Sequence, residues 1–297
     1  MADQMVIFGG TGFVGRSIAE AALGTGFEVR LASRSGESFA GAKGVVCNIT
    51  DEAQVAAALE GATVAVNCVG ILAPGKGGNG FEALQAEGAE RIARLSAAAG
   101  VNRMVQVSAI GADAGSDSLY QRTKAKGEAG VLAHMPNALI LRPSIVFGPG
   151  DSFFNRFAGM SKLSPVVPVV GAGTRFQPIF VGDIAAAVIA GIAQGAEGVH
   201  ELGGPEVESF ADLMHRMLGV LERKRLVLSL PTPIGMVMGA SFETLSALTG
   251  GALEPQITRD QVKNLGEDNV VSGAFPGLEA LGVTPTPMAD VMPTYLS

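Results

Sequence analysis

Cysteine is scarce: the 297-residue chain contains two, and they form no CxxC pair. This scarcity excludes a cysteine-based metal framework and favours a reducing compartment. Cys47 and Cys68 lie in predicted strands, where small buried thiols are common. Histidine is scarce too, and the three residues are scattered along the chain, at His134, His200 and His215. Because they form no ligand cluster, we expect no metal site.

Long uncharged stretches and positive charge are also in short supply. No run of about 18 apolar residues exists, so we expect no membrane-spanning helix. The first predicted strand begins within a few residues of Met1, which leaves no room for a signal peptide and predicts a protein that is not secreted. The net charge is -7 and the isoelectric point about 5.1. That balance argues against nucleic acid as the main partner.

The opening of the chain carries the clearest motif. An apolar run at 5–8 leads into a glycine-rich turn and then into helical spacing of apolar residues. A strand, a glycine turn and a helix in this order predict a dinucleotide-binding site, whereas the alternative is a generic glycine-rich turn. The glycines allow close backbone approach to a pyrophosphate, and the helix start attracts its charge. The residues predicted to bind the cofactor here are Gly9, Thr11, Gly12, Phe13, Val14 and Gly15.

Strands and helices alternate through the first half of the chain. The predicted strands are 5–8, 27–32, 44–47, 63–68, 102–108 and 138–141, and the predicted helices are 51–59, 81–99 and 119–133. This order predicts an α/β fold with a Rossmann-type, doubly wound parallel sheet covered by helices on both faces.

Frequent prolines break the chain after residue 150 into short elements. We therefore predict a dinucleotide-binding domain over 1–150 and a smaller C-terminal α/β domain over 151–297. Within the latter, 176–195 is expected to return to the first domain as a strand and a helix, with Asp183 as the helix N-cap.

The end of the second predicted strand indicates which nucleotide is bound. An acidic residue at this place usually binds the ribose of NAD. Here Ser33 and Arg34 stand instead, and a guanidinium can pair with a 2′-phosphate. This favours NADP(H). NAD(H) remains the alternative, because Arg34 could be a solvated surface residue and Glu37 could serve a ribose.

Tyr120 and Lys124 are candidate catalytic residues. Their spacing of four places both side chains on one face of a helix that follows the fifth strand. A nearby ammonium favours tyrosinate, which prepares the phenol to exchange a proton with a substrate oxygen. The same lysine can hydrogen-bond the nicotinamide ribose. A chance YxxxK is common in helices, but the chain has only two tyrosines.

These residues resemble the short-chain dehydrogenase/reductase superfamily in its extended and atypical branches. The resemblance implies that Tyr120 is the acid/base, that Lys124 supports it, and that a strand-five hydroxyl polarises the substrate carbonyl. Ser108 matches that hydroxyl, but the apolar Ala109 and Ile110 follow it where active members carry further hydroxyls. Whether the chain turns over a substrate is therefore left open. The resemblance also assigns cofactor contacts to Asn48, Cys68, Val69, Gly70, Val107, Pro143 and Ile145.

Motifs in the second half narrow the resemblance to one branch. Ile257-Thr258-Arg259-Asp260 and Pro276-Gly277-Leu278-Glu279 look like the NADPH-binding accessory subunit of respiratory complex I, the alpha-subcomplex subunit 9 family. This implies a mainly structural NADPH and a place on the peripheral arm of complex I, near the quinone-binding region. Relatives linked to ubiquinone biosynthesis imply a quinone-biosynthesis assembly as another partner. The expected location is cytoplasmic, with peripheral association at the inner membrane as a further option.

Simpler explanations exist for several C-terminal patterns. Thr258 with Gln261 forms a capping box, and Ser209 with Asp212 opens a helix. The uncharged, methionine-rich segment 233–242 fits either core packing, which we favour, or a surface for a partner, a quinone or a membrane.

Two functions therefore compete. The chain is either a nucleotide-loaded structural protein, which is the prediction, or an NADP(H)-dependent reductase of the epimerase/dehydratase type that acts on a quinone-related or other hydrophobic carbonyl.

Overall fold

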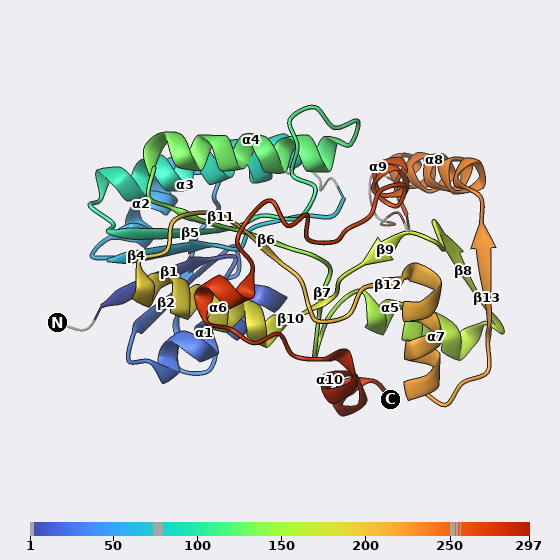
Figure 1. Cartoon of the computed structure of the whole chain (residues 1–297). Helices are drawn as coiled ribbons and strands as arrows, with labels where there is room; N and C mark the ends of the chain where they lie inside the picture. Colours follow the sequence, from blue (N-terminus) through green and yellow to red (C-terminus); the bar gives the residue numbers. More distant parts are fainter. Residues whose placement is uncertain (1–2, 74–79, 250–252, 254, 256) are drawn as a thin grey trace.

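Seven parallel strands form the central sheet of the molecule (Figure 1). The computed structural model describes residues 3–73, 80–249, 253, 255 and 257–297. Across the sheet the strands follow the order β11-β6-β5-β4-β1-β2-β3, and every neighbouring pair is parallel. Their bounds are β1 Gln4–Phe8, β2 Glu28–Ser33, β3 Lys43–Val46, β4 Val64–Asn67, β5 Arg103–Val107, β6 Leu139–Pro143 and β11 Gly198–Leu202.

Helices cover both faces of this sheet, as Figure 1 shows. One face packs against α1 (Phe13–Gly24) and α6 (Val181–Gln194). The other face packs against α2 (Glu52–Leu59), α3 (Glu87–Ala98) and α4 (Leu119–His134). Successive residues of β1 enter the two hydrophobic clusters alternately, which explains why the strand is apolar throughout.

The doubly wound Rossmann-type sheet is thus confirmed, and each predicted strand ends within two residues of the observed one. The predicted helix 81–99 differs in its first turn, because η1 (Glu82–Ala86) is a π-helix that runs directly into α3. Such π-turns are rare and occur mainly at functional sites.

Most of the remaining elements contribute to a third hydrophobic cluster that is rich in phenylalanine, whereas η2 packs into the first cluster through Leu278 and Leu281. The remaining elements are β7 Val146–Phe147, α5 Phe154–Leu163, β8 Val166–Val170, β9 Arg175–Phe176, β10 Ile179–Phe180, β12 Glu208–Ser209, α7 Phe210–Val220, β13 Leu226–Leu230, α8 Thr232–Leu248, α9 Arg259–Asn264, η2 Leu278–Leu281 and α10 Met288–Tyr295. The division of the chain into two domains at residue 150 stays a prediction.

Residues 181–202 lie with the first half of the chain, since α6 packs on α1 and β11 pairs with β6. The prediction that Asp183 caps this helix is wrong, because α6 begins at Val181 and its N-cap is Phe180. Instead, the Asp183 carboxylate accepts hydrogen bonds from the Thr286 N–H and hydroxyl, both at 2.7 Å. It ties the C-terminal segment to α6.

The expectation that segment 233–242 is core is also wrong. It lies in α8, whose buried residues are Gly235 and Gly239. A Cβ at Gly239 would lie 2.8 Å from the Arg259 nitrogen, so the glycines let the helix approach its neighbours while its large apolar side chains stay outside. Val237, for example, is 68% exposed. The predicted capping box at Thr258 and the Ser209 cap are both present.

Candidate functional site

Two of the turns predicted to bind the cofactor lie where the strand order reverses. The chain leaves β1 for β2 on one side and reaches β4 on the other, so the carboxyl ends of β1 and β4 form the topological switch point of the sheet. Open α/β sheets bind their ligands at this point. The glycine turn follows β1, and the turn Cys68–Gly70 follows β4.

The glycine turn is closed by contacts that only glycine permits. Gly9 has a φ of +75°, and a Cβ at Gly15 would lie 2.4 Å from the Gly9 carbonyl oxygen. The N-cap of α1 is Gly12, with no side-chain cap and no acidic residue in the first turn. The first N–H groups of α1 are therefore open to an anion, as a pyrophosphate requires. Thr11 lies in this turn, and Phe13 and Val14 begin α1.

The turn after β4 packs directly against the glycine turn. A Cβ at Gly9 would lie 3.2 Å from the backbone of Cys68 and Val69. The Asn67 side chain shapes this turn, because its Oδ1 accepts from the Val69 N–H at 3.0 Å. Gly70 faces the catalytic candidates, since a Cβ there would lie 3.2 Å from Lys124 Nζ. Burial raises the pKa of the Cys68 thiol to about 12, so we expect it to stay neutral.

Arg34 follows β2 on the other side of the glycine turn. It is exposed, and among the described residues it has no ion-pair partner. Ser33 is buried, and its hydroxyl accepts from the Gly36 N–H at 3.1 Å, which holds the turn on which Arg34 stands. Glu37, the alternative ribose ligand, forms an ion pair with Arg16 of α1, with 4.0 Å between Oε2 and Nη2.

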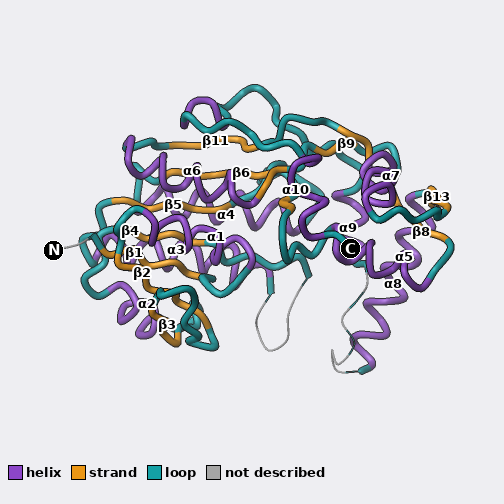
Figure 2. Tube along the Cα trace, turned by 90° about the horizontal axis from the view of Figure 1, so that it is seen from below, coloured by secondary structure: helices purple, strands orange, loops and turns teal. Residues whose placement is uncertain are grey.

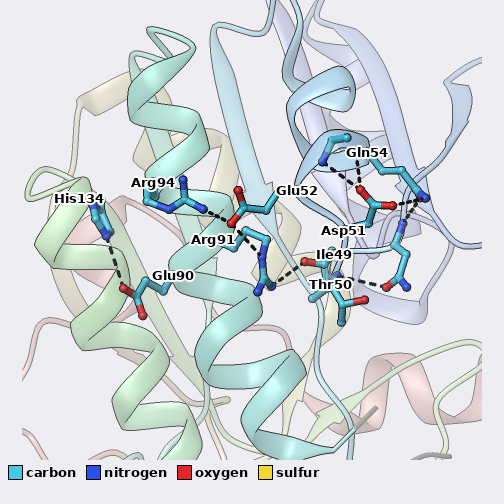
Figure 3. A network of polar contacts seen from close by, with 11 residues as sticks. Ile49, Thr50, Asp51, Glu52, Gln54, Glu90, Arg91, Arg94 and His134 are labelled. Atoms are coloured by element: carbon cyan, nitrogen blue, oxygen red, sulfur yellow. Dashed lines mark hydrogen bonds and ion pairs between the residues drawn. The ribbon is translucent and has the colours of Figure 1, made fainter. Parts of the chain in front are cut away.

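Asn48 lies at the start of the loop that leads into α2. Its side-chain oxygen accepts from the Thr50 N–H at 3.2 Å. The neighbouring Asp51 caps α2, and Arg91 of α3 donates to the Ile49 carbonyl at 3.0 Å, as Figure 3 shows. The structure thus gives Asn48 a role in holding this loop, and its contact with adenine stays a prediction.

Tyr120 and Lys124 lie side by side in the first turns of α4. Lys124 Nζ lies 5.9 Å from the centre of the Tyr120 ring, and it donates to the Val107 carbonyl at 3.4 Å. Burial raises the pKa of Tyr120 to about 12 and lowers the pKa of Lys124 to about 8. The expectation that the ammonium lowers the tyrosine pKa is therefore wrong for the free protein, because burial outweighs it.

Ser108 follows β5 and is 4% exposed. Within the described part of the chain its hydroxyl has no hydrogen-bond partner. A buried hydroxyl without a partner is costly unless a ligand supplies one. Pro143 accepts from the Ile110 N–H at 3.0 Å, and Ile145 accepts from the Ile179 N–H at 2.9 Å. These two residues carry the chain out of the sheet beside the turn that follows Ser108.

Gln85 is a candidate that sequence reasoning missed. It lies in the π-turn, is 2% exposed, and donates through Nε2 to Thr123 Oγ1 at 3.1 Å. Its Oε1 is buried without a partner among the described residues and faces Gly70. The sequence held one indirect signal: Gly127 of α4 leaves the space into which the Gln85 carbonyl packs, since a Cβ there would lie 2.1 Å from that oxygen.

Asp260 is the second residue whose place was missed. Its motif was recognised, but its partners, 140 to 142 positions away in sequence, were not. Its carboxylate accepts from the Ser118 hydroxyl at 2.9 Å and from the Leu119 and Tyr120 N–H groups at 2.7 and 3.1 Å. It therefore sits directly on the start of α4.

The arrangement fits a nicotinamide dinucleotide. The glycine turn and uncapped α1 suit the pyrophosphate, and the prediction assigns Tyr120, Lys124 and Ser108 to the nicotinamide end. The nucleotide would supply a hydride, and these side chains would hold it and move a proton. No group of three potential metal ligands occurs among the described residues, and within the same ranges no helix is long and apolar enough to cross a membrane.

Comparisons with known proteins agree with this geometry. A family model described as NAD(P)H-binding matches residues 9–142. The chain is 17% identical to dTDP-glucose 4,6-dehydratase from Streptomyces venezuelae, covering 99% of this chain and 95% of that one with a TM-score of 0.74. It is 16% identical to dTDP-4-dehydrorhamnose reductase from Bacillus anthracis, solved with NADP, covering 89% and 98% with a TM-score of 0.67. Fold and site thus define a nicotinamide dinucleotide-binding protein of the short-chain dehydrogenase/reductase type.

Closer similarity is found to a particular branch. The chain is 30% identical to NADH dehydrogenase [ubiquinone] 1 alpha subcomplex subunit 9, mitochondrial, of Arabidopsis thaliana, over 94% of this chain and 73% of the relative. It is 33% identical to the rat protein of the same name but spans about half of it, 66% of this chain matching 52% of the relative. A ceramide reductase from Caulobacter vibrioides is 29% identical, with 82% and 79% covered. The chain belongs to the alpha-subcomplex subunit 9 family.

Proposed function

We propose that this protein binds NADP(H) at the switch point and that the nucleotide is mainly structural. The observation that carries the proposal is the set of residues at the adenosine end: an exposed Arg34 on a turn held by Ser33, beside a glycine turn and a helix without an acidic first turn. A guanidinium there pairs with a 2′-phosphate and gains nothing from the ribose hydroxyl of NAD. Bound nucleotide stabilises the folded state because the unfolded chain does not bind it.

The nucleotide preference is tested by comparing dissociation constants for NADPH and NADH. We expect Arg34→Ala to weaken NADPH at least tenfold and to leave NADH within twofold, because the variant removes a pair that only NADPH makes. Arg30→Ala is the matched control, since Arg30 lies on β2, the strand that Arg34 follows, but donates to the Ala58 carbonyl at 2.5 Å, away from the turn. Equal losses for both nucleotides in Arg34→Ala would contradict the preference.

We further propose that the chain associates peripherally with a respiratory NADH dehydrogenase at the cytoplasmic face of its membrane. Support comes from the subunit 9 relatives and from an apolar face at the end of the molecule remote from β1. Figure 2 shows α8 running outward from the body of the chain at this end. The exposed apolar residues of α5, β13 and α8 at this end are Leu163, Leu226, Leu228, Ile234, Val237, Leu245 and Leu248. Val237, Leu245 and Leu248 line one open groove on α8. Exposed apolar patches usually mark interaction surfaces.

Native gel migration of the tagged protein from gently solubilised host membranes tests the association. We expect co-migration with NADH:quinone oxidoreductase activity, and loss of it in Val237→Glu, whose side chain is 68% exposed. Val207→Glu, at a 49% exposed position outside this face, should still co-migrate. Migration of the wild type only as a small free species, or with a quinone-biosynthesis assembly, would contradict the proposal.

A reductase function is the second candidate. It is favoured by the Ser108 hydroxyl, which has no partner among the described residues and follows Val107, whose carbonyl accepts from Lys124. In this case Ser108 would donate to a carbonyl oxygen that Tyr120 protonates while the nicotinamide delivers hydride. The similarity to a ceramide reductase suggests a lipid carbonyl as well as a quinone-related one. NADPH oxidation with such carbonyls that is lost in Tyr120→Phe but kept in Tyr295→Phe, whose hydroxyl donates to Asp151 instead, would establish it. If NADPH is oxidised with none of these carbonyls, the reductase function is excluded for them and the structural role stays the proposed function.

A further inference from the structure

The first turn of α4 depends on a carboxylate from a distant part of the chain. A helix leaves its first N–H groups without partners, and α4 has no acidic residue of its own in that turn. Its N-cap Ser118 reaches only the Gln121 N–H, at 3.4 Å. The Leu119 and Tyr120 N–H groups both donate to Asp260, and the Ser118 hydroxyl does so too.

Asp260 is itself held firmly. It is the second residue of α9, whose capping box joins Thr258 and Gln261. The Gln261 amide also donates to the Leu72 carbonyl at 3.0 Å, and Lys263 donates to the Asp117 carbonyl at 3.2 Å. Helix α9 is thus fixed to the segments after β4 and before α4, both of which border the proposed nucleotide site.

The position of Asp260 matters because of what the first turn of α4 carries. Tyr120 is the second residue of the helix, where helices fray most readily. Its side chain must meet the nicotinamide end within a few tenths of an ångström to contact it productively. A negative charge at this helix end also acts favourably on the helix dipole.

We propose that Asp260 is a positioning residue that holds Tyr120 in place by capping α4 from the C-terminal part of the chain. The inference rests on the proposed nucleotide site at Tyr120 and Lys124. The positioning role explains why Asp260 is part of the Thr258–Asp260 motif, whereas the capping box of α9 involves only Thr258 and Gln261. The same role also connects the exposed helix α8 with the site, because Glu243 of α8 accepts from the Arg259 N–H at 2.8 Å and from its Nε at 2.7 Å.

The test compares two ligands, NADPH and 2′,5′-ADP, which is the adenosine half without nicotinamide. In Asp260→Ala we expect the dissociation constant for NADPH to rise about tenfold and that for 2′,5′-ADP to stay within twofold, because only the nicotinamide end lies against α4. Asp260→Asn keeps an acceptor oxygen without the charge, so we expect a rise of about threefold. If Asp260→Ala does not fold, Asp260→Asn is the variant with which the inference is tested.

Asp268→Ala is the matched control. Asp268 is also a carboxylate that joins the C-terminal segment to another element, accepting from the Arg175 N–H and Nε, both at 2.8 Å, but it does not touch α4. We expect it to bind both ligands like the wild type. Equal weakening of both ligands in Asp260→Ala, or equal effects of the two substitutions on NADPH, would overturn the inference. A wild type that binds neither ligand would overturn the nucleotide site itself and this inference with it.

Discussion

Removing the charge of Glu128 is expected to destabilise the fold more than any other single charge removal on α4. Glu128 accepts from Arg142 Nε at 2.9 Å and from Nη2 at 2.6 Å, and the side chains are 6% and 15% exposed. Glu128→Gln leaves a largely buried guanidinium without its hydrogen-bonded carboxylate, although Glu201 and Asp113 still act on its charge; losing one partner of a buried pair costs about 3–5 kcal/mol. Because Arg142 also stacks on Phe275, 5.1 Å from the ring centre, we expect the lower end, about 3 kcal/mol.

Thermal and urea unfolding of the nucleotide-free protein measure this loss, which should lower Tm by roughly 6–12 °C. Two controls make the result specific. Glu90→Gln removes an exposed pair with His134 at 3.6 Å and should change stability by less than about 0.5 kcal/mol. Glu128→Leu combined with Arg142→Met should recover most of the loss, since apolar residues can replace a buried pair. A loss below about 1 kcal/mol in Glu128→Gln, or no recovery in the double variant, would refute the reasoning.

Two further predictions concern the same helix. Burial lowers the pKa of Lys124 to about 8 from its ordinary value of 10.5, so between these two pH values the unfolded chain binds more protons than the folded one. The free energy of unfolding of the wild type should therefore rise with pH over this range relative to that of Lys124→Met. Parallel pH profiles of urea unfolding for the two proteins would contradict this. Gly127→Ala places a Cβ 2.1 Å from the Gln85 carbonyl oxygen and should cost about 1–3 kcal/mol, whereas Gly24→Ala in α1, with open space around it, should be neutral or stabilising. Similar unfolding midpoints for the two glycine variants would show that the π-turn moves freely.

Local patterns predicted the parts of the site that are contiguous in sequence. The strand before Gly9, the helix after it and the spacing of Tyr120 and Lys124 are set by backbone geometry over a few residues. The parallel sheet with helices on both faces followed from the alternation of strands and helices. For this reason the Rossmann-type sheet and the position of its ligand-binding edge could be predicted before the structure.

Features that depend on packing between distant segments could not be predicted in this way. Nothing near Asp260 in sequence indicates that it caps a helix that begins more than a hundred positions earlier. The exposure of α8 was missed because an uncharged segment is compatible with either a core or a surface, and only the placement of Gly235 and Gly239 decides which face is covered. The pKa of Tyr120 likewise depends on burial, which the spacing to Lys124 does not reveal.

The proposed function requires that the chain holds NADP(H) as a structural ligand. Purifying the protein without added nucleotide, denaturing it and quantifying the NADP(H) and NAD(H) released per chain tests this requirement. We expect close to one NADP(H) per chain and little NAD(H). Gly15→Ala should release neither, because its Cβ would lie 2.4 Å from the Gly9 carbonyl oxygen. Release of NAD(H) in place of NADP(H), or an empty protein that binds neither on addition, would contradict the proposed function.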